Sequence, residues 1–281
     1  MNPTVAVVAQ GAMGAGVAAR LVERGLTVLT SLDGRSEASA KRARAAGMVA
    51  ASDQECAQAD IFLSICPPSD AMALAEKMAK LIAANNKKPV YVDCNAVSPP
   101  TKVKIGEVIV RSGAPFVDGG IIGLPPKENY TPFIHVSGAD AAKVAPLNEF
   151  GIKINVIDGP VGAASALKMS FGGITKGVTA VASMMMLAAT RAGVADKLRA
   201  ELERSYPTYL TSFQRGVPDM FDKAYRFVGE MEEVSDFTGQ GDPAARKLYE
   251  AVAEFYTRIA ADHDGKHEET GALAAFLKKK D

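Results

Sequence analysis

The stretch VGAASALKMSFGGITKGVTAVASMMMLAAT, residues 161–190, separates two halves of the chain that are built differently. It is almost wholly apolar, and its charged residues are Lys168 and Lys176. As one helix it would span about 45 Å, and a helix that is apolar on nearly all sides must be buried on nearly all sides. Two lysines and several glycines argue against a membrane span. We therefore expect a long helix between two domains, covered by its own chain and by a partner subunit.

Composition indicates a soluble globular protein and argues against several classes of partner. The chain has 281 residues, 48% of them apolar and 23% charged, which suggests one large or two ordinary domains. Lys plus Arg equals Asp plus Glu at 32 each, so no net charge attracts nucleic acid or an anionic membrane. Three cysteines without metal-ligand spacing, Cys56, Cys66 and Cys94, are typical of reduced thiols in a cytoplasmic protein.

The N-terminal segment has the pattern of a dinucleotide-binding fingerprint. Residues 4–9, TVAVVA, predict a central parallel strand, and a glycine-rich turn then leads into an amphipathic helix that ends at Gly25. Such a turn lets backbone N–H groups approach a pyrophosphate at the positive end of the helix. Ala9 replaces the first glycine of G-x-G-x-x-G, so a plain glycine turn stays open as an alternative. The expected cofactor-binding residues here are Gly11, Ala12, Met13 and Gly14.

Recognition of the adenosine ribose is expected after the second strand, residues 26–31. An acid directly at the strand end would favour the unphosphorylated cofactor, but this strand ends in Ser31. Arg35 and Ser36 follow, and together they can bind a 2′-phosphate through a charge-assisted fork and a hydroxyl. Asp33 is the counter-argument, because its carboxylate can hold a 2′-hydroxyl. The pattern favours NADP, with NAD as the alternative.

Strands and helices alternate through the first half, which predicts a doubly wound, Rossmann-like α/β domain over residues 1–158. Further strands are expected at 60–66, 89–94, 115–118, 134–137 and 155–157, and helices at 36–47, 70–84 and 102–112. Ligands bind at the carboxyl ends of such strands. The loops after the later strands therefore add Cys66, Pro67, Pro68, Asn95 and Ala96 to the expected cofactor-binding residues.

The second half shows no strand pattern, so we expect an all-helical domain over residues 159–281. Helices are predicted at 195–205, from Pro207 onward, at 219–237 and at 244–263. Within the third of these, Lys223, Arg226, Glu230 and Glu233 are spaced as in a surface ion-pair ladder. No metal is expected: His263 and His267 lie four residues apart, but Gly265 interrupts the helix between them, and no third ligand is near.

Four motifs, in order and spacing over residues 5–172, resemble the 3-hydroxyacid dehydrogenases, the group that includes 3-hydroxyisobutyrate and 6-phosphogluconate dehydrogenases. The turn at 11–14 resembles that family's G-x-M-G motif, and residues 92–99 (VDCNAVSP) resemble its strand and loop beside the nicotinamide. Residues 116–123 (FVDGGIIG) stand where the family binds substrate, and residues 159–162 (GPVG) precede the position of the catalytic lysine, Lys168. Residues 223–233 are similar to a branch with a distinct C-terminal helical domain.

The resemblance implies an oxidoreductase in which Lys168 is the general acid in reduction and the general base in oxidation. Asn95 and Ser98 are the candidates for orienting the nicotinamide or the substrate. The substrate-binding positions also include Ile122, Gly123 and Gly172. Ile122 replaces a serine of the family and Gly172 an asparagine, so polar substrate contacts are lost and a roomier, more apolar pocket is expected.

Three functions remain open on these residues. The first is an NADP-dependent dehydrogenase or reductase that acts on a hydroxyl or carbonyl group of a small molecule, either a 3-hydroxyacid or a bulkier alcohol. The second is an imine reductase, which the apolar Ile122 favours and Lys168 disfavours. The third is a non-catalytic NADP-binding protein. We expect a homodimer, no nucleic acid or membrane partner, and a site between the domains or between subunits.

Overall fold

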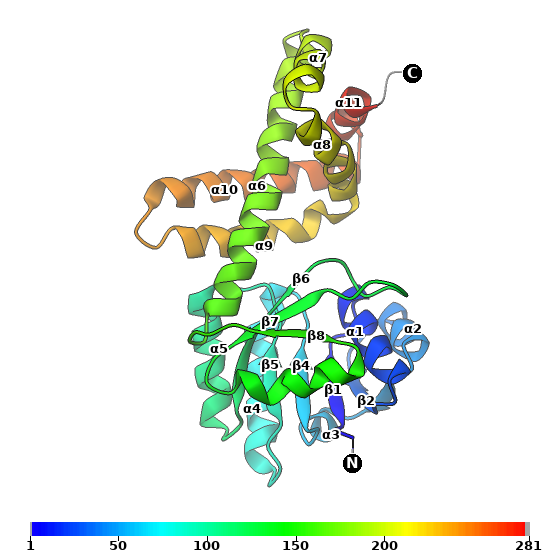
Figure 1. The fold of residues 1–281 in the computed structure, drawn as a ribbon, viewed down its shortest axis with the longest axis vertical. Helices are drawn as coiled ribbons and strands as arrows, with labels where there is room; N and C mark the ends of the chain where they lie inside the picture. The colour runs from blue at the N-terminus through cyan, green and yellow to red at the C-terminus, as the bar shows by residue number, and fades with distance from the viewer. Residues whose placement is uncertain (1, 279–281) are drawn as a thin grey trace. The chain divides into compact units, whose positions relative to one another are not determined.

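The computed structural model describes residues 2–278 and divides the chain into two units (Figure 1). The first unit ends at Met169 and the second begins at Ser170. The domain boundary expected from the sequence lies earlier, after residue 158, and the structure groups residues 159–169 with the first unit. The two units are described separately below.

The first unit is built on one mixed sheet, in which β1 to β6 run parallel and β7 and β8 run in the opposite direction. Across the described residues the strand order is β3-β2-β1-β4-β5-β6-β7-β8. The strands are β1 Val5–Val8, β2 Val28–Ser31, β3 Val49–Ala51, β4 Ile61–Ser64, β5 Val90–Asp93, β6 Phe116–Ile122, β7 Phe133–Ser137 and β8 Lys153–Val156. This order confirms the doubly wound α/β class predicted from the alternating pattern.

Helices cover both faces of this sheet, because alternate side chains of each central strand point to opposite sides. In β1, Val5 and Val7 pack in a core with α1, whereas Ala6 and Val8 pack in a second core with α4 and α5. Both faces are therefore apolar, which explains why the strand sequences show no polar alternation. The helices of the first unit are α1 Ala12–Glu23, α2 Glu37–Ala45, α3 Asp53–Cys56, α4 Ala71–Ala84 and α5 Pro99–Arg111, with 3₁₀ segments at Pro68–Asp70 and Ala141–Phe150.

Strand β6 extends to Ile122, beyond the predicted end at Asp118. Gly119 and Gly120 weaken the strand pattern in the sequence, because glycine has low strand propensity. In the structure these glycines permit close packing. A Cβ at Gly119 would lie 2.9 Å from Cys94 Sγ, and one at Gly120 would lie 2.9 Å from the carbonyl oxygen of Ala164. The sequence pattern also missed β3 and α3, which are short and follow an exposed segment.

The second unit is helical throughout its described residues, as expected. The long helix α6, Ala163–Arg191, enters it from the first unit, and the remaining helices are α7 Ala195–Ser205, α8 Pro207–Met220, α9 Ala224–Thr238, α10 Pro243–His263 and α11 Glu268–Leu277, with a 3₁₀ turn at Phe221–Lys223. The predicted helix start at Asp219 is wrong, because α8 continues through Pro218. Helix α11 was not predicted.

Helix α6 leaves a row of apolar side chains exposed in the second unit. Phe171, Ile174, Val178, Val181 and Met185 are each between 45% and 66% exposed. All of them except Phe171 line an apolar groove of about 520 Å³ between α6, α7, α8 and α10. By length and composition alone α6 also qualifies as a candidate membrane span, with 28% of its most apolar window buried. The described chain alone therefore leaves this face of the helix uncovered, and the expected cover by a partner subunit stays a prediction.

Candidate functional site

The predicted cofactor-binding residues lie at one edge of the sheet. Strands β2, β1, β4 and β5 are consecutive neighbours and parallel, so their carboxyl ends lie side by side. The residues expected to contact the cofactor follow these four ends in the loops and first helical turns, and they are Gly11, Ala12, Met13, Gly14, Ser31, Arg35, Ser36, Cys66, Pro67, Pro68, Asn95 and Ala96. This edge is where ligands bind in open α/β sheets.

The turn between β1 and α1 fits a dinucleotide pyrophosphate. Gly11 is the N-cap of α1, makes no side-chain cap, and has open space where a Cβ would stand. A Cβ at Gly14 would lie 2.0 Å from the carbonyl oxygen of Ala9, so the turn requires glycine there. The first turn of α1 contains no acid, and its N–H groups have no partner within the helix. Backbone donors and an unopposed helix dipole are the groups that bind phosphate.

Gln10, within the same turn, links β1 to the end of β2. Its side-chain amide donates to Thr30 Oγ1 and, at 2.6 Å, to the carbonyl oxygen of Ser31. The residue is fully buried, and its Oε1 atom accepts no hydrogen bond from any residue within 2–278. A buried acceptor without a donor is unfavourable, and a hydroxyl of a bound ribose has the chemistry to satisfy it. Gln10 was not predicted from the sequence, because its contacts are with Thr30 and Ser31, about 20 residues away in the chain.

After β2, Arg35 and Ser36 are exposed at the start of α2, and Ser36 is the N-cap of that helix. Arg35 forms no ion pair with a carboxylate of residues 2–278. Asp33 lies in the same loop, but it lines a separate groove with Ser52 and Lys77. The loop therefore presents a guanidinium and a hydroxyl, while the acid that would favour NAD lies beside residues of α3 and α4.

Lys168 lies in the second turn of α6, packed against the end of β6. Its ammonium donates to the carbonyl oxygen of Ile121 at 2.7 Å, and the residue is half-buried. Because β6 is parallel to β5, this carbonyl lies toward the same sheet edge as the cofactor loops. The absence of a side chain at Gly120 allows this approach, since a Cβ there would lie 3.2 Å from Lys168 Cβ. Ile122, half-buried, and Gly123, exposed, follow directly on β6.

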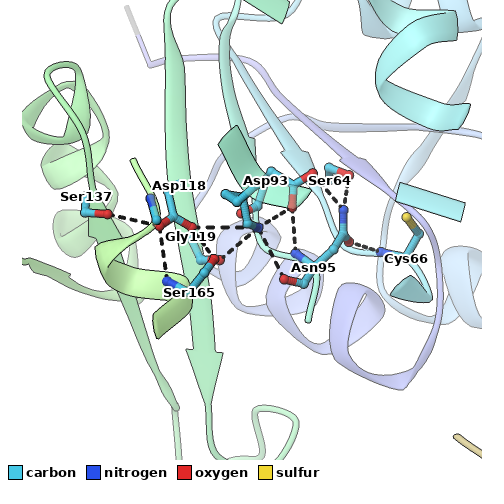
Figure 2. A network of polar contacts seen from close by, with 10 residues as sticks. Ser64, Cys66, Asp93, Asn95, Asp118, Gly119, Ser137 and Ser165 are labelled. Atoms are coloured by element: carbon cyan, nitrogen blue, oxygen red, sulfur yellow. Dashed lines mark hydrogen bonds and ion pairs between the residues drawn. The ribbon is translucent and has the colours of Figure 1, made fainter. Parts of the chain in front are cut away.

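A buried ionic network supports both the cofactor loops and the start of α6 (Figure 2). Lys102 of α5 is fully buried and forms an ion pair with Asp93 at the end of β5. Its ammonium also lies 3.8 Å from Asp118 of β6 and donates to the carbonyl oxygen of Asn95 at 3.2 Å. Burial by itself would lower the pKa of Lys102, but Asp93 and Asp118 outweigh that effect and raise it.

Asp118 caps the helix that carries Lys168. One of its oxygens accepts the N–H groups of Gly162 at 2.8 Å and Ser165 at 3.1 Å, and the other accepts the Ser165 hydroxyl at 2.6 Å. Ser137 of β7 donates to Asp118 and accepts the N–H of Ala164 at 3.0 Å. The N–H groups that α6 cannot satisfy itself are thus bound by two neighbouring strands, which positions the helix over β6.

Asn95 connects the same network to the loop after β4. Its Oδ1 accepts the N–H of Cys66 at 2.6 Å, and its amide donates to Ser64 at 2.8 Å and Asp93 at 3.0 Å. Because the Asn95 side chain is buried and bonded to Cys66, it fixes the backbone of the loop that contains Cys66 and Pro67. Ser98 is also buried, at the N-cap of α5, and its hydroxyl lies 2.9 Å from that of Thr101.

The thiols near this edge are not suited to nucleophilic chemistry. Burial, reinforced by the charge of Asp93, raises the pKa of Cys66 to about 12. Burial likewise raises the pKa of Cys94 to about 12, although Lys102 acts in the opposite direction. Both cysteines are therefore protonated thiols at neutral pH.

Gly172, the last predicted substrate-binding position, lies on α6 in the second unit. A Cβ there would lie 3.8 Å from the ammonium of Lys176. Lys176 forms an ion pair with Glu230 of α9, and both side chains are 20% exposed. Two members of the expected surface ladder have partners outside it: Glu230 pairs with Lys176 of α6, and Lys223 pairs with Asp219. Lys176, to which the sequence assigned no role, places its ammonium beside Gly172, where the related dehydrogenases have an asparagine.

Comparisons with known proteins agree with the fold. Residues 4–150 match the family model of the NAD binding domain of 6-phosphogluconate dehydrogenase, and residues 189–259 match a domain of unknown function, DUF1932. An uncharacterised 28.5 kDa protein of Methanothermus fervidus is 36% identical over 180 residues, which cover 63% of this chain and 68% of the relative.

Two solved structures show the same fold over almost the whole chain. A conserved protein of unknown function, described as structurally similar to 3-hydroxyacid dehydrogenases, is 26% identical with a TM-score of 0.73, covering 96% of this chain and 99% of its own. The 3-hydroxyisobutyrate dehydrogenase of Mycobacterium tuberculosis, solved with L-serine, is 19% identical with a TM-score of 0.74. The match covers 99% of this chain and 98% of that enzyme.

The fold and the glycine turn define a protein with a nicotinamide-dinucleotide-binding Rossmann domain. The chain belongs to the family of the NAD binding domain of 6-phosphogluconate dehydrogenase, with a DUF1932 domain after it. The resemblance to 3-hydroxyacid dehydrogenases, first drawn from four short motifs, is confirmed.

The buried network generates a prediction about stability. Lys102→Met should lower the free energy of unfolding by about 3–5 kcal/mol, because it leaves two buried carboxylates without their cation. Since the pKa of Lys102 is raised above 10.5 in the folded protein, its contribution is complete below pH 10.5 and is lost as pH rises beyond the folded value. Urea unfolding should therefore show a constant deficit below pH 10.5 that shrinks at higher pH.

Lys104→Met is the control, because Lys104 is exposed on the same helix. It should change stability by less than about 0.5 kcal/mol. An equal effect of the two substitutions would contradict the proposed importance of the buried pair.

Proposed function

We propose that the protein is an NADP-dependent oxidoreductase that interconverts a hydroxyl and a carbonyl group on a small molecule. The observation that carries the proposal is the position of Lys168, whose ammonium is held at the end of β6, beside the edge formed by the cofactor loops. Family membership supports the nicotinamide cofactor. The dehydrogenase fold of the solved relatives supports the reaction class.

When bound, the nicotinamide supplies or accepts the hydride. The chain's own part is to hold the cofactor and manage one proton. In reduction, Lys168 donates a proton from Nζ to the oxygen of the carbonyl as the hydride reaches the carbon; in oxidation it removes the hydroxyl proton. The carbonyl oxygen of Ile121 orients the ammonium, and Asp118, by capping α6, fixes the helix that carries it.

Imine reduction is the second candidate. The observation that favours it is Ile122, an apolar side chain at the end of β6, at the position where the related dehydrogenases have a substrate-binding serine. A panel of hydroxyacids, bulkier alcohols, carbonyls and imines, followed by the absorbance of NADPH, separates the two reactions. Tight NADPH binding without turnover on the whole panel would instead favour a non-catalytic binding protein.

Lys168→Met should lower turnover by about a hundredfold to ten-thousandfold, the usual contribution of a general acid or base. Affinity for NADPH should stay nearly the same, because the phosphate-binding turn is formed by other residues. Methionine keeps most of the packing of the lysine stem, so the melting temperature reports any structural role separately. A folded Lys168→Met protein with full turnover would end the catalytic assignment.

Cofactor preference gives an independent prediction. NADPH should bind more tightly than NADH, and Arg35→Ala should reduce that preference at least about tenfold, because a charge-assisted contact to a phosphate is lost. Fluorescence titration with both cofactors measures it. Lys41→Ala, which removes an exposed charge of α2, is the control and should leave the ratio unchanged. Equal affinity of the unaltered protein for the two cofactors would refute the NADP assignment.

The exposed face of α6 supports a homodimer. Phe171, Ile174, Val178, Val181 and Met185 are separated by three, four, three and four residues, the spacing at which one helix packs lengthwise against another. A contiguous row of exposed apolar side chains is typical of a surface that binds another protein. A second copy of the chain, related by a twofold axis, covers the same patch on both subunits.

Light scattering should therefore report a dimer at micromolar concentration. Val178→Asp places a charge in the middle of the apolar face, at a side chain that is 51% exposed, so it should dissociate the dimer without unfolding the subunit. Val110→Asp, at a 57% exposed valine of α5, is the matched control and should remain dimeric. A monomeric unaltered protein would contradict the assignment.

A further inference from the structure

Arg42 reaches back from the middle of α2 to the glycine turn. Its Nε donates to the carbonyl oxygen of Gln10 at 2.8 Å, and its Nη2 donates to Ser39 Oγ at 3.0 Å. The contact with Gln10 joins residues that lie 32 positions apart in the chain. The guanidinium is therefore held at the edge where the ends of β1 and β2 meet, although Arg42 itself lies on a helix beyond the predicted ribose loop.

The charge of Arg42 is not neutralised by the chain. No carboxylate of residues 2–278 lies within ion-pair distance of it, whereas Arg44, two positions further on, pairs with Glu37. The same Glu37 is the acid in the first turn of α2, and its pairing with Arg44 reduces its repulsion of an anion there. Of the five N–H donors of the Arg42 guanidinium, two are used by Gln10 and Ser39, which leaves three for a ligand.

Hydroxyl groups connect Arg42 to the loop that holds Arg35. Ser39 Oγ lies 3.2 Å from Ser36 Oγ, and Ser36 follows Arg35 directly in the chain. The Arg42 guanidinium thus lies at one end of a row of two hydroxyls, Ser39 and Ser36, and Arg35, which also has no carboxylate partner within residues 2–278, adjoins Ser36 in the chain. Such a row matches a dianionic phosphate ester, which has three oxygens to accept charge-assisted hydrogen bonds.

We propose that Arg42, with Ser39, is a second determinant of NADP specificity and contacts the 2′-phosphate of the adenosine ribose from α2. This inference rests on the proposed NADP preference. The contact of Arg42 with Gln10 also links phosphate recognition to the turn that contains Gly11 and Gly14, since Gln10 in turn binds Thr30 and Ser31 of β2.

The test is the binding of NADPH, NADH and 2′,5′-ADP to the full-length protein, by fluorescence and by calorimetry. Arg42→Gln should weaken NADPH and 2′,5′-ADP at least tenfold and NADH less than twofold. Arg42→Lys should recover only part of the loss, because lysine keeps the charge without the planar fork. Lys41→Gln, which removes an exposed charge of the same helix, is the matched control and should leave all three affinities unchanged.

Two results would overturn the inference. If Arg42→Gln weakens NADPH and NADH equally, Arg42 serves only to brace the glycine turn. If it weakens neither, the row of hydroxyls is not a phosphate site. A protein that prefers NADPH before substitution but keeps that preference in Arg42→Gln rejects this inference alone, whereas a protein that never prefers NADPH rejects the proposed cofactor as well.

Discussion

Lys102 is an ammonium group buried completely between the carboxylates of Asp93 and Asp118, and the first unit depends on this contact. A buried charge is tolerated only when it is paired and hydrogen-bonded. Here the lysine also donates to main-chain oxygens of Asp93, Asn95 and Gly119. The contact fastens α5 to the end of β5 and to the middle of β6, the two strands beside which the candidate site is built.

The consequences of this pairing reach the residues that would do the chemistry. Two carboxylates paired with one lysine leave an excess negative charge. Asp118 accepts N–H groups at the N-terminus of α6, and these groups and the helix dipole offset that charge. Asp93, on the other side, holds Asn95, which fixes the backbone at Cys66. One polar cluster therefore sets the position of a cofactor loop and of the helix that carries Lys168 (Figure 2).

The close packing of α6 on β6 illustrates where local reasoning fails. Gly119 and Gly120 argue for a strand that ends early, because glycine has low strand propensity. The structure continues the strand, because antiparallel pairing with β7 supplies its hydrogen bonds and because only glycine lets the backbone of α6 approach. Lys102 was missed for a related reason. Lys102 lies three and seven residues before the buried Ile105 and Ile109, so it falls on the same face of α5 as these apolar residues. A lysine on an apolar helix face was the one sign in the sequence that this residue is buried.

Local patterns in the sequence determined the alternation of strands and helices, the glycine turn at the start of α1, the helical second half and the place of Lys168 on a long apolar helix. These follow from short-range rules, since periodicity and turn geometry depend on neighbours in the chain. Tertiary structure alone decided that Asp93, Lys102, Asp118 and Ser165 meet, and that Arg42 reaches Gln10. Such pairings join distant positions, and their energy depends on burial and on the direction of hydrogen bonds, neither of which is encoded in local spacing.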